Sequence, residues 1–361
     1  MKNQNTNILT QNNTTEASRV VKLGMDVHAK TISVVRIFGS GSAEPAQSFS
    51  YEKLIRWVKT KHLDNGWEVY ACYEAGPTGF GLQRQLERLG VSCHVVQPRK
   101  WDEYGRGVKT DALDAKALAM RLSAYVDGNK DALALVRIPS VEEELLKDQS
   151  RQRERLRKNR QQLAAYGCSL LLKHGYSEGC GWWKPRKWKC LQQSIDEETL
   201  AMLRIYHKAV MDLKDAEDAL IEQMEQRAPE KLPKGLGRLT FVTLLCEIGD
   251  WNRFNNRKQV AAFTGLCPRE SSSGKKKRYG HISKHGNPRI RAVLVELAWR
   301  LVRWQPDSRL VQKHKDKLVQ GAFSGNKKKA IIAISRQLSI DLWRLFTEQT
   351  TMEELGFIAA N

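Results

Sequence analysis

The chain has 361 residues, and its 60 Lys and Arg against 40 Asp and Glu give a formal net charge of +20. This length suffices for two or three domains with hydrophobic cores, and the basic balance predicts a polyanionic partner. Nucleic acid is the first expectation, with a ribosomal role or an anionic membrane surface as competitors. No apolar stretch approaches the roughly 20 residues of a membrane span. The polar residues 1–18 lack a signal-peptide core, which favours a flexible tail on a cytoplasmic protein, and seven cysteines without a C-x-x-C pair favour reduced thiols.

Residues 19–127 are expected to form an α/β domain. Apolar and β-branched runs predict strands at 20–25, 31–38, 48–51, 67–73 and 91–96, and helical periodicity predicts helices at 53–61, 82–89 and 108–122. The resulting order is strand, strand, strand, helix, strand, helix, strand, helix. In a ribonuclease H-type sheet with this order, the first and fourth strands are neighbours.

Acidic residues stand at the ends of these predicted elements. Asp26 follows the first strand and Glu74 ends the fourth, while Asp111 and Asp114 begin the last helix on one face. Taken singly, Asp26 fits a turn and Glu74 a loop. Asp111 and Asp114 fit a solvated first helical turn, in which the helix dipole favours acids. Together they predict a site for Mg²⁺, because a hard divalent cation selects carboxylate oxygens and a two-metal site activates phosphodiester chemistry.

Three segments in this region resemble a known family. GMDVHAKTISV, YEAGPTGFGLQRQLERLG and VKTDALDAKALA are similar to the three blocks of the DEDD transposases of the IS110 family of insertion sequences, IS1111 branch. The resemblance implies a RuvC-like N-terminal domain whose catalytic, Mg²⁺-binding residues are Asp26, Glu74, Asp111 and Asp114. No role follows for His28, which is interpreted as a surface or sheet-edge histidine.

Residues 128–229 are expected to be mainly helical. A long basic helix is predicted at 142–172, and Ser194 with Glu197 forms a capping-box pattern before a second long helix. The apolar stripe of the second helix is close to heptad spacing, which predicts a hairpin or coiled-coil arm, or an ordinary helical core: Leu203, Tyr206, Val210, Leu213, Leu220 and Met224. An exposed arm would be a dimerisation device, and the resemblance implies a similar coiled coil in the family.

An aromatic and basic insert lies between these two helices. Aromatic rings can stack on bases while cations meet phosphates, so we expect nucleic-acid contacts here, with a hydrophobic plug bearing a charged rim as the alternative. The residues concerned are Trp182, Trp183, Lys184, Arg186, Lys187 and Trp188. Cys168, His174, Cys180 and Cys190 match no standard zinc-site spacing.

Residues 230–361 are expected to form a mainly α-helical domain. The segment LPKGLGRLTFVTLLCEIGD begins with a Pro/Gly turn and continues as an apolar helix. The turn could leave the N-terminus of the helix free to bind phosphate, or it could simply connect two helices. In the resembled family a glycine usually follows the proline directly, whereas Lys234 stands at that position here. Amphipathic helices are predicted at 290–301 and 329–346.

A serine-rich basic loop precedes these helices. From the residues alone it is a flexible linker with phosphate-binding cations, namely Lys275, Lys276, Lys277, Arg278, Lys284, Arg289 and Arg291. The pattern GLCPRESSSGKKKR with ISKHGN looks like the transposase domain of the same family, whose nucleophilic serine immediately precedes a glycine. The resemblance therefore implies Ser273 as the nucleophile, with Ser271 and Ser272 as rivals.

The expected function is cleavage and rejoining of DNA through a phosphoserine intermediate, which conserves the energy of the phosphodiester bond. The enzyme would act as a homo-oligomer, a dimer or tetramer, on element ends and target DNA in the bacterial nucleoid. The resemblance also implies a composite site and a non-coding bridge RNA as guide. The alternatives are a RuvC-like nuclease that uses water as nucleophile and a non-enzymatic nucleic-acid-binding protein.

Overall fold

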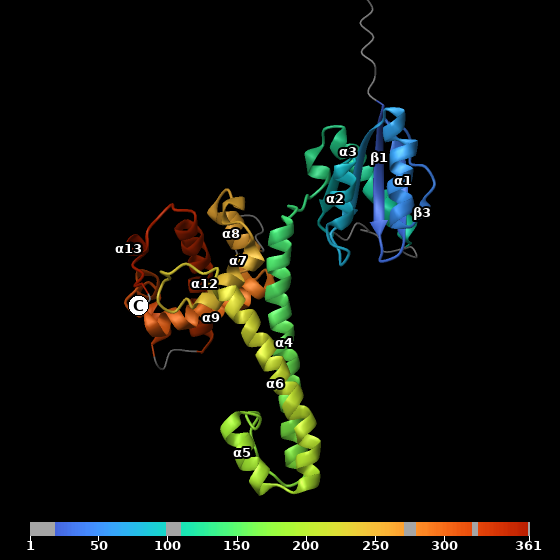
Figure 1. Ribbon diagram of the computed structural model, residues 1–361. Coiled ribbons are helices and arrows are strands. Elements are labelled where there is room, and N and C mark those ends of the chain that lie inside the picture. Colours follow the sequence, from blue (N-terminus) through green and yellow to red (C-terminus); the bar gives the residue numbers. More distant parts are fainter. Residues whose placement is uncertain (1–18, 99–109, 271–278, 320–323, 360–361) are drawn as a thin grey trace, which may run out of the picture. The chain divides into compact units, whose positions relative to one another are not determined.

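The computed structural model describes residues 19–98, 110–270, 279–319 and 324–359 (Figure 1). The chain divides into two compact units, residues 1–138 (unit 1) and 139–361 (unit 2). Within the described ranges, none of the helices combines the length and apolar character that a membrane crossing requires.

Unit 1 contains a mixed five-stranded sheet in the order β3-β2-β1-β4-β5. β1 is antiparallel to β2 and parallel to β4, which in turn is parallel to β5. The predicted order of strands and helices is confirmed, as is the pairing of the first and fourth strands. The strands are β1 (Val20–Val27), β2 (Ile32–Phe38), β3 (Gln47–Phe49), β4 (Glu68–Glu74) and β5 (Ser92–Val96).

Helices cover both faces of the sheet at its central strands, so the sequences of β1, β2 and β4 are mainly apolar, whereas the edge strand β3 is mostly exposed. On one face, Leu23 and Met25 of β1 belong to one buried core with Leu54 of α1 (Tyr51–Lys61) and Leu86 of α2 (Gly81–Arg88). The other face packs against α3 (Asp111–Val126), whose Leu118 and Leu122 share a core with Cys72. Short 3₁₀ helices lie at Leu63–Asn65 and Lys130–Ala132.

The contacts between β1 and α3 fix the direction of the helix. The Nζ atom of Lys22, near the start of β1, lies 2.6 Å from Asp127 Oδ1, just after α3 ends. A Cβ atom at Gly24 would lie 2.1 Å from the backbone nitrogen of Ala119, so only glycine allows this close approach. α3 therefore runs antiparallel to β1, and its first turn lies beside the end of β1.

Unit 2 begins with a helical hairpin. α4 (Val141–Lys173) opens with a capping box between Ser140 and Glu143, and α6 (Glu197–Glu225) packs against it. The predicted capping box at Ser194 is wrong. Ser194 is the last residue of a third helix, α5 (Pro185–Ser194), and the Asp196 carboxylate caps α6 by accepting a hydrogen bond from Thr199 N at 2.7 Å.

A buried acid interrupts the apolar stripe of the hairpin. Leu203, Val210 and Met224 of α6 are fully buried at heptad positions, and Glu217 occupies the heptad position between Val210 and Met224. Arg160 of α4 donates from Nε to Glu217 Oε2 at 3.0 Å, and Arg153 lies 4.0 Å from the other oxygen. A satisfied ion pair in a coiled-coil seam disfavours other registers, because shifting the helices would leave buried charges unpaired.

The remainder of unit 2 is a helical domain with one short hairpin of strands. The predicted helices at 290–301 and 329–346 are confirmed as parts of longer helices. The elements are α7 (Arg238–Ile248), α8 (Arg257–Thr264), β6 (Pro268–Glu270), β7 (Tyr279–Ile282), α9 (Pro288–Trp304), α10 (Arg309–Gln312), α11 (Lys315–Leu318), α12 (Ser324–Phe346) and α13 (Met352–Leu355), with a 3₁₀ turn at Trp251–Arg253.

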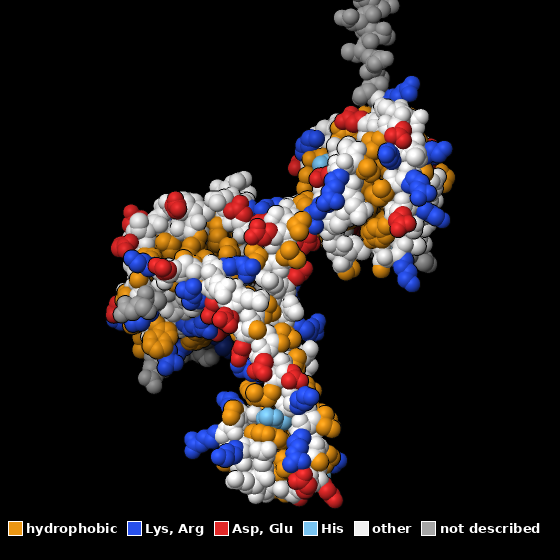
Figure 2. Space-filling model, viewed as in Figure 1, with side chains coloured by type: hydrophobic (Ala, Val, Ile, Leu, Met, Phe, Trp, Pro, Cys, Tyr) orange, Lys and Arg blue, Asp and Glu red, His pale blue; other side chains and the backbone are white. Residues whose placement is uncertain are grey.

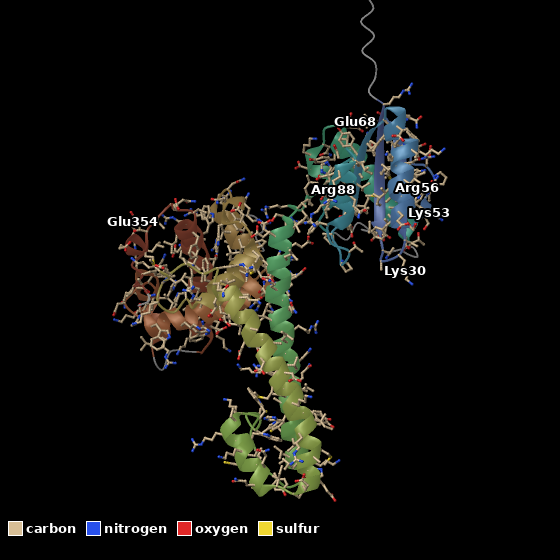
Figure 3. The ribbon with its side chains drawn as sticks, in the orientation of Figure 1. Lys30, Lys53, Arg56, Glu68, Arg88 and Glu354 are labelled. Atoms are coloured by element: carbon tan, nitrogen blue, oxygen red, sulfur yellow. The ribbon has the colours of Figure 1, made fainter. Side chains whose placement is uncertain are left out.

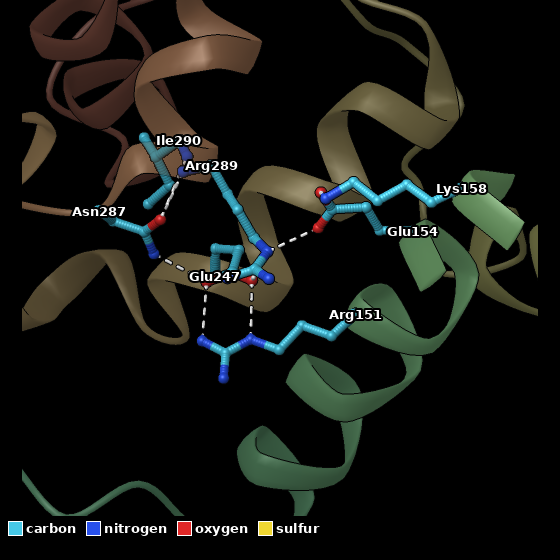
Figure 4. Close-up of polar contacts among 7 residues, drawn as sticks. All are labelled: Arg151, Glu154, Lys158, Glu247, Asn287, Arg289 and Ile290. Atoms are coloured by element: carbon cyan, nitrogen blue, oxygen red, sulfur yellow. Dashed lines mark hydrogen bonds and ion pairs between the residues drawn. The ribbon is translucent and has the colours of Figure 1, made fainter. Parts of the chain in front are cut away.

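A polar network joins α4 to this helical domain (Figure 4). The buried Glu247 of α7 accepts hydrogen bonds from Arg151 Nε at 3.2 Å and from Asn287 Nδ2 at 2.7 Å. Arg289 donates from Nε to Glu154 Oε2 at 2.7 Å. Hydrogen bonds from Lys158 and Arg289 lower the pKa of Glu154 to about 2. The paired charges hold the base of the hairpin against α7 and α9.

Candidate active site

Three side chains converge at the end of β1. His28 Nε2 lies 3.1 Å from Asp26 Oδ2 and 3.4 Å from Asp111 Oδ2. The exposed Lys30 marks this edge of the sheet in Figure 3, whereas Glu68, at the start of β4, marks the opposite edge. The imidazole thus stands between a carboxylate from a strand and a carboxylate from the first turn of a helix.

The backbone explains how these groups meet. Side chains alternate along a strand, so Asp26 and His28 lie on the same side as Lys22 and Gly24, which contact α3. After β1 the chain turns sharply, with His28 N donating to Thr31 O at 2.9 Å. The Tyr51 hydroxyl donates to His28 O at 2.9 Å and fixes the turn against α1.

The charged groups of this cluster change the pKa values of Asp26 and His28. Burial raises the pKa of Asp26, the nearby Asp111 and Asp114 add to the rise, and His28 counteracts it. The negative charge of Asp26 in turn raises the pKa of His28. Ionised carboxylates are therefore costly here unless a positive charge is close, which a bound cation would supply.

Glu74 and Asp114 are placed by the elements that carry them. Met25 and Tyr73 are the last paired residues of the parallel strands β1 and β4, so Asp26 and Glu74 are the next residues at the same edge. Glu74 is two residues after Cys72 in β4, so their side chains lie on the same face of the sheet. Cys72 Sγ donates to Leu118 O of α3 at 3.5 Å, so this is the face that α3 covers. Asp114 is in the first turn of α3 with Asp111.

The donor set fits a divalent cation. One ligand atom from each of Asp26, His28 and Asp111 lies within 4.8 Å of the others, a group able to hold a metal ion. Carboxylate oxygens suit Mg²⁺ and Mn²⁺, and an imidazole is also accepted by Mn²⁺ and other transition metals. His28 is exposed, as the sequence interpretation expected, but its contacts with Asp26 and Asp111 were not anticipated. Its position two residues after Asp26, at the end of a strand, was the available signal.

The serine loop lies between two paired strands. β6 and β7 are antiparallel, with Pro268 opposite Ile282, and they flank residues 271–278. The predicted nucleophile Ser273, its rivals Ser271 and Ser272, and the predicted contacts Lys275, Lys276, Lys277 and Arg278 lie outside the described residues.

The remaining predicted contacts of this region are placed by the structure. Lys284 is exposed after β7 with a φ of 57°. Arg291 Nη1 donates to Thr264 O at 3.2 Å, so it binds backbone between α8 and β6. Arg289 belongs to the polar network with Glu154. Arg291 therefore binds backbone oxygens of α8 and of the segment after β7, whereas Arg289 binds the acidic side chain of Glu154.

The aromatic insert at the end of the hairpin forms a small core of its own. Trp182 is fully buried and donates from Nε1 to Ala164 O at 2.8 Å, and Trp183 is also buried. Trp188 stacks on His207, with ring centroids 4.0 Å apart. The rings of Trp182 and Trp183 are thus enclosed and not free to stack on a base. The cations Lys184, Arg186 and Lys187 are exposed, and Lys187 Nζ lies 2.8 Å from Glu178 Oε2. Figure 2 shows both basic and acidic side chains at this end of the hairpin.

Comparisons with known proteins agree on one family. Residues 232–312 match the family model described as "Transposase IS116/IS110/IS902 family". The chain is 32% identical over 308 residues to the Sinorhizobium fredii protein y4rJ, which is named as a transposase; the match covers 78% of this chain and 77% of that protein. It is 28% identical to the Leptospira borgpetersenii transposase for insertion sequence element IS1533, covering 78% of this chain and 85% of that protein. The transposase for element IS1111A of Coxiella burnetii is 25% identical over 284 residues, covering 74% of this chain and 75% of that protein. This chain belongs to the IS116/IS110/IS902 family of insertion-sequence transposases, which are DNA-processing enzymes.

Proposed function

We propose that unit 1 is a RuvC-like catalytic domain of ribonuclease H type, in which Asp26, Glu74, Asp111 and Asp114 hold Mg²⁺. The observation that carries the proposal is the convergence of Asp26 and Asp111 on His28 at the end of β1. Bound Mg²⁺ would polarise the scissile phosphate and stabilise the charge that develops on its oxygens. His28 would orient the two carboxylates, because its Nε2 atom lies within 3.4 Å of both.

We infer that Ser273 is the nucleophile. Its Oγ atom would attack the phosphorus of a DNA strand, forming an Oγ–P bond while the bond from phosphorus to the deoxyribose oxygen breaks. The serine proton leaves to solvent, and the departing oxygen takes up a proton. Because the number of phosphodiester bonds is conserved, the reverse attack by another deoxyribose hydroxyl rejoins strands without an external energy source. The pairing of β6 with β7 supports this proposal, because it brings together the two described segments that precede and follow residues 271–278.

The partners in this proposal are DNA, a guide RNA and further copies of the chain. The net charge of +20 supports binding to nucleic acid. Base pairing by a bridge RNA would select the DNA sequence, and the protein would mainly read backbone. Lys184, Arg186 and Lys187, exposed at the end of the hairpin, are proposed phosphate contacts, and the hairpin is the proposed oligomerisation arm.

The experiment compares serine variants on DNA that carries the element and its flanks. With Mg²⁺, the wild-type protein is expected to give a protein–DNA adduct that survives denaturing electrophoresis, and Ser273→Ala is expected to give neither adduct nor cleavage. Ser271→Ala and Ser272→Ala are matched controls that should retain both. Cleavage by Ser273→Ala without an adduct would instead establish the second candidate, a RuvC-like nuclease that uses water.

A further inference from the structure

A broad groove lies between α8 and α12 in unit 2. Its volume is about 750 Å³, and its α12 wall is one helical face in which Arg336, Ile340 and Arg344 succeed one another at intervals of four residues. Asn256 and the first two residues of α8 line the opposite wall. Of the predicted nucleic-acid contacts that the structure describes, none lines this groove.

The charged residues that line the groove in the described part of the chain are all cations. They are Arg257, Lys258, Arg336 and Arg344, and no acid lines the groove among the described residues. Within the described part of the chain, none of these four cations lies at ion-pair distance from a carboxylate, and Arg344 interacts electrostatically with Asp341 and Glu354 from farther away. By contrast, Arg151 and Arg160 of α4 and Arg289 of α9 each bind a glutamate. The acid on this stretch of α12, Asp341, is buried and accepts a hydrogen bond from Gln337 Nε2 at 2.8 Å.

The floor of the groove determines what kind of ligand fits. Ile340 and Trp343 form part of it, but they are only 8% and 7% exposed, so no aromatic face is open for an unpaired base. The exposed groups are guanidinium, ammonium and amide groups, which are the donors that bind phosphate oxygens. This chemistry favours contact with a phosphodiester backbone over stacking on single-stranded bases.

We propose that the α8–α12 groove binds the backbone of duplex DNA. The choice of DNA rests on the family of the chain, whose members process DNA, and does not depend on Ser273 as the nucleophile. The four cations that line the groove would displace counterions from several phosphates. DNA binding in the groove therefore depends strongly on salt concentration and little on DNA sequence. The groove thus supplies affinity and orientation, and leaves sequence choice to other parts of the complex.

The test measures binding of the full chain to fluorescent duplex DNA over a range of KCl concentrations, with EDTA present so that no cleavage occurs. Arg336→Gln/Arg344→Gln and Arg257→Gln/Lys258→Gln each remove two cations. Each double variant is expected to lower affinity by about tenfold, equally for an element-end duplex and a scrambled duplex, and to reduce the slope of log K against log salt by about 2.

Two controls separate the groove from net charge and folding. Arg336→Lys/Arg344→Lys keeps the charge and should keep the slope, while Lys315→Gln/Lys317→Gln removes two charges from α11 outside the groove and should leave binding near that of the wild type. Wild-type affinity and slope in both groove variants would overturn the proposal. So would loss of binding to a folded RNA with DNA binding retained, which would assign the groove to RNA. Because no cleavage is measured, these outcomes are independent of the serine chemistry.

Discussion

Replacing Asp26 with Asn is expected to reduce DNA cleavage by about 10³-fold, which corresponds to about 4 kcal/mol of lost transition-state stabilisation. The amide keeps the shape of the side chain but cannot supply the negative charge that a metal ligand requires. The fold should persist, because burial and the nearby Asp111 and Asp114 raise the pKa of Asp26 and make its ionised form unfavourable in the protein. The measurement pairs a cleavage time course with a thermal melt of the same preparation.

The matched control for this prediction is Glu68→Gln. Glu68 is an exposed acid on β4, the strand that also carries Glu74, and it stands at the opposite edge of the sheet (Figure 3). Glu68→Gln should cleave like the wild type, which would show that the position of the acid matters and not the loss of one negative charge. Cleavage by Asp26→Asn at the wild-type rate would remove Asp26 from the active site.

Replacing Gly24 with Ala is expected to destabilise unit 1 by about 3 kcal/mol or more and to lower cleavage in any protein that still folds. The added Cβ atom would lie 2.1 Å from Ala119 N and 2.3 Å from Ala115 O, both in the backbone of α3. Backbone atoms cannot rotate away as a side chain can, so α3 must move off the sheet and carry Asp111 with it. Denaturant unfolding and cleavage assays measure the two effects separately.

Gly81→Ala provides the comparison for this substitution. Gly81 is the first residue of α2, and an added Cβ atom there meets no atom within 4 Å. Alanine also favours helix more than glycine does, so Gly81→Ala should be neutral or slightly stabilising. If Gly24→Ala melted and cleaved like Gly81→Ala, the close packing of α3 on β1 would not be what positions Asp111.

The order of elements in unit 1 was predictable because local patterns determine it. Strands of β-branched residues and amphipathic helices are separated by turn residues, which gives their order. The pairing of β1 with β4 was expected because that order fits a ribonuclease H-type sheet, in which these strands are neighbours. The convergence of Asp26 with Asp111 followed from that order and is present in the structure. The contacts of His28 with the two acids were missed because an exposed histidine after a strand has many ordinary surroundings, and only the three-dimensional position of α3 distinguishes this one.

The sequence was less informative where contacts between distant segments determine the surroundings of a residue. The Trp/Lys insert was expected to offer aromatic rings to bases, but Trp182 packs against α4 at Gly167, where a Cβ atom would lie 2.2 Å from its ring. The short strands β6 and β7 have no clear alternation, and the sequence predicted no strand at either position. Residues that meet in the α8–α12 groove, such as Arg257 and Arg336, are about 80 positions apart, so no local pattern reveals them.

The structure also separates two uses of charge in unit 2. At the base of the hairpin, Arg151 and Arg289 are bound to buried or half-buried glutamates and stabilise the packing of α4. In the α8–α12 groove, the cations line an open surface without such partners among the described residues. Net charge alone could not distinguish these roles, because both sets contribute equally to the total of +20.

Binding of Mn²⁺, followed by electron paramagnetic resonance and by competition with Mg²⁺, tests the acidic site most directly. The wild-type chain is expected to bind Mn²⁺ saturably and to release it as Mg²⁺ is added, whereas Asp26→Asn and Asp111→Asn should each lose this binding and Glu68→Gln should keep it. Equal Mn²⁺ binding by all four proteins would contradict the assignment of a metal centre to the end of β1 and the first turn of α3.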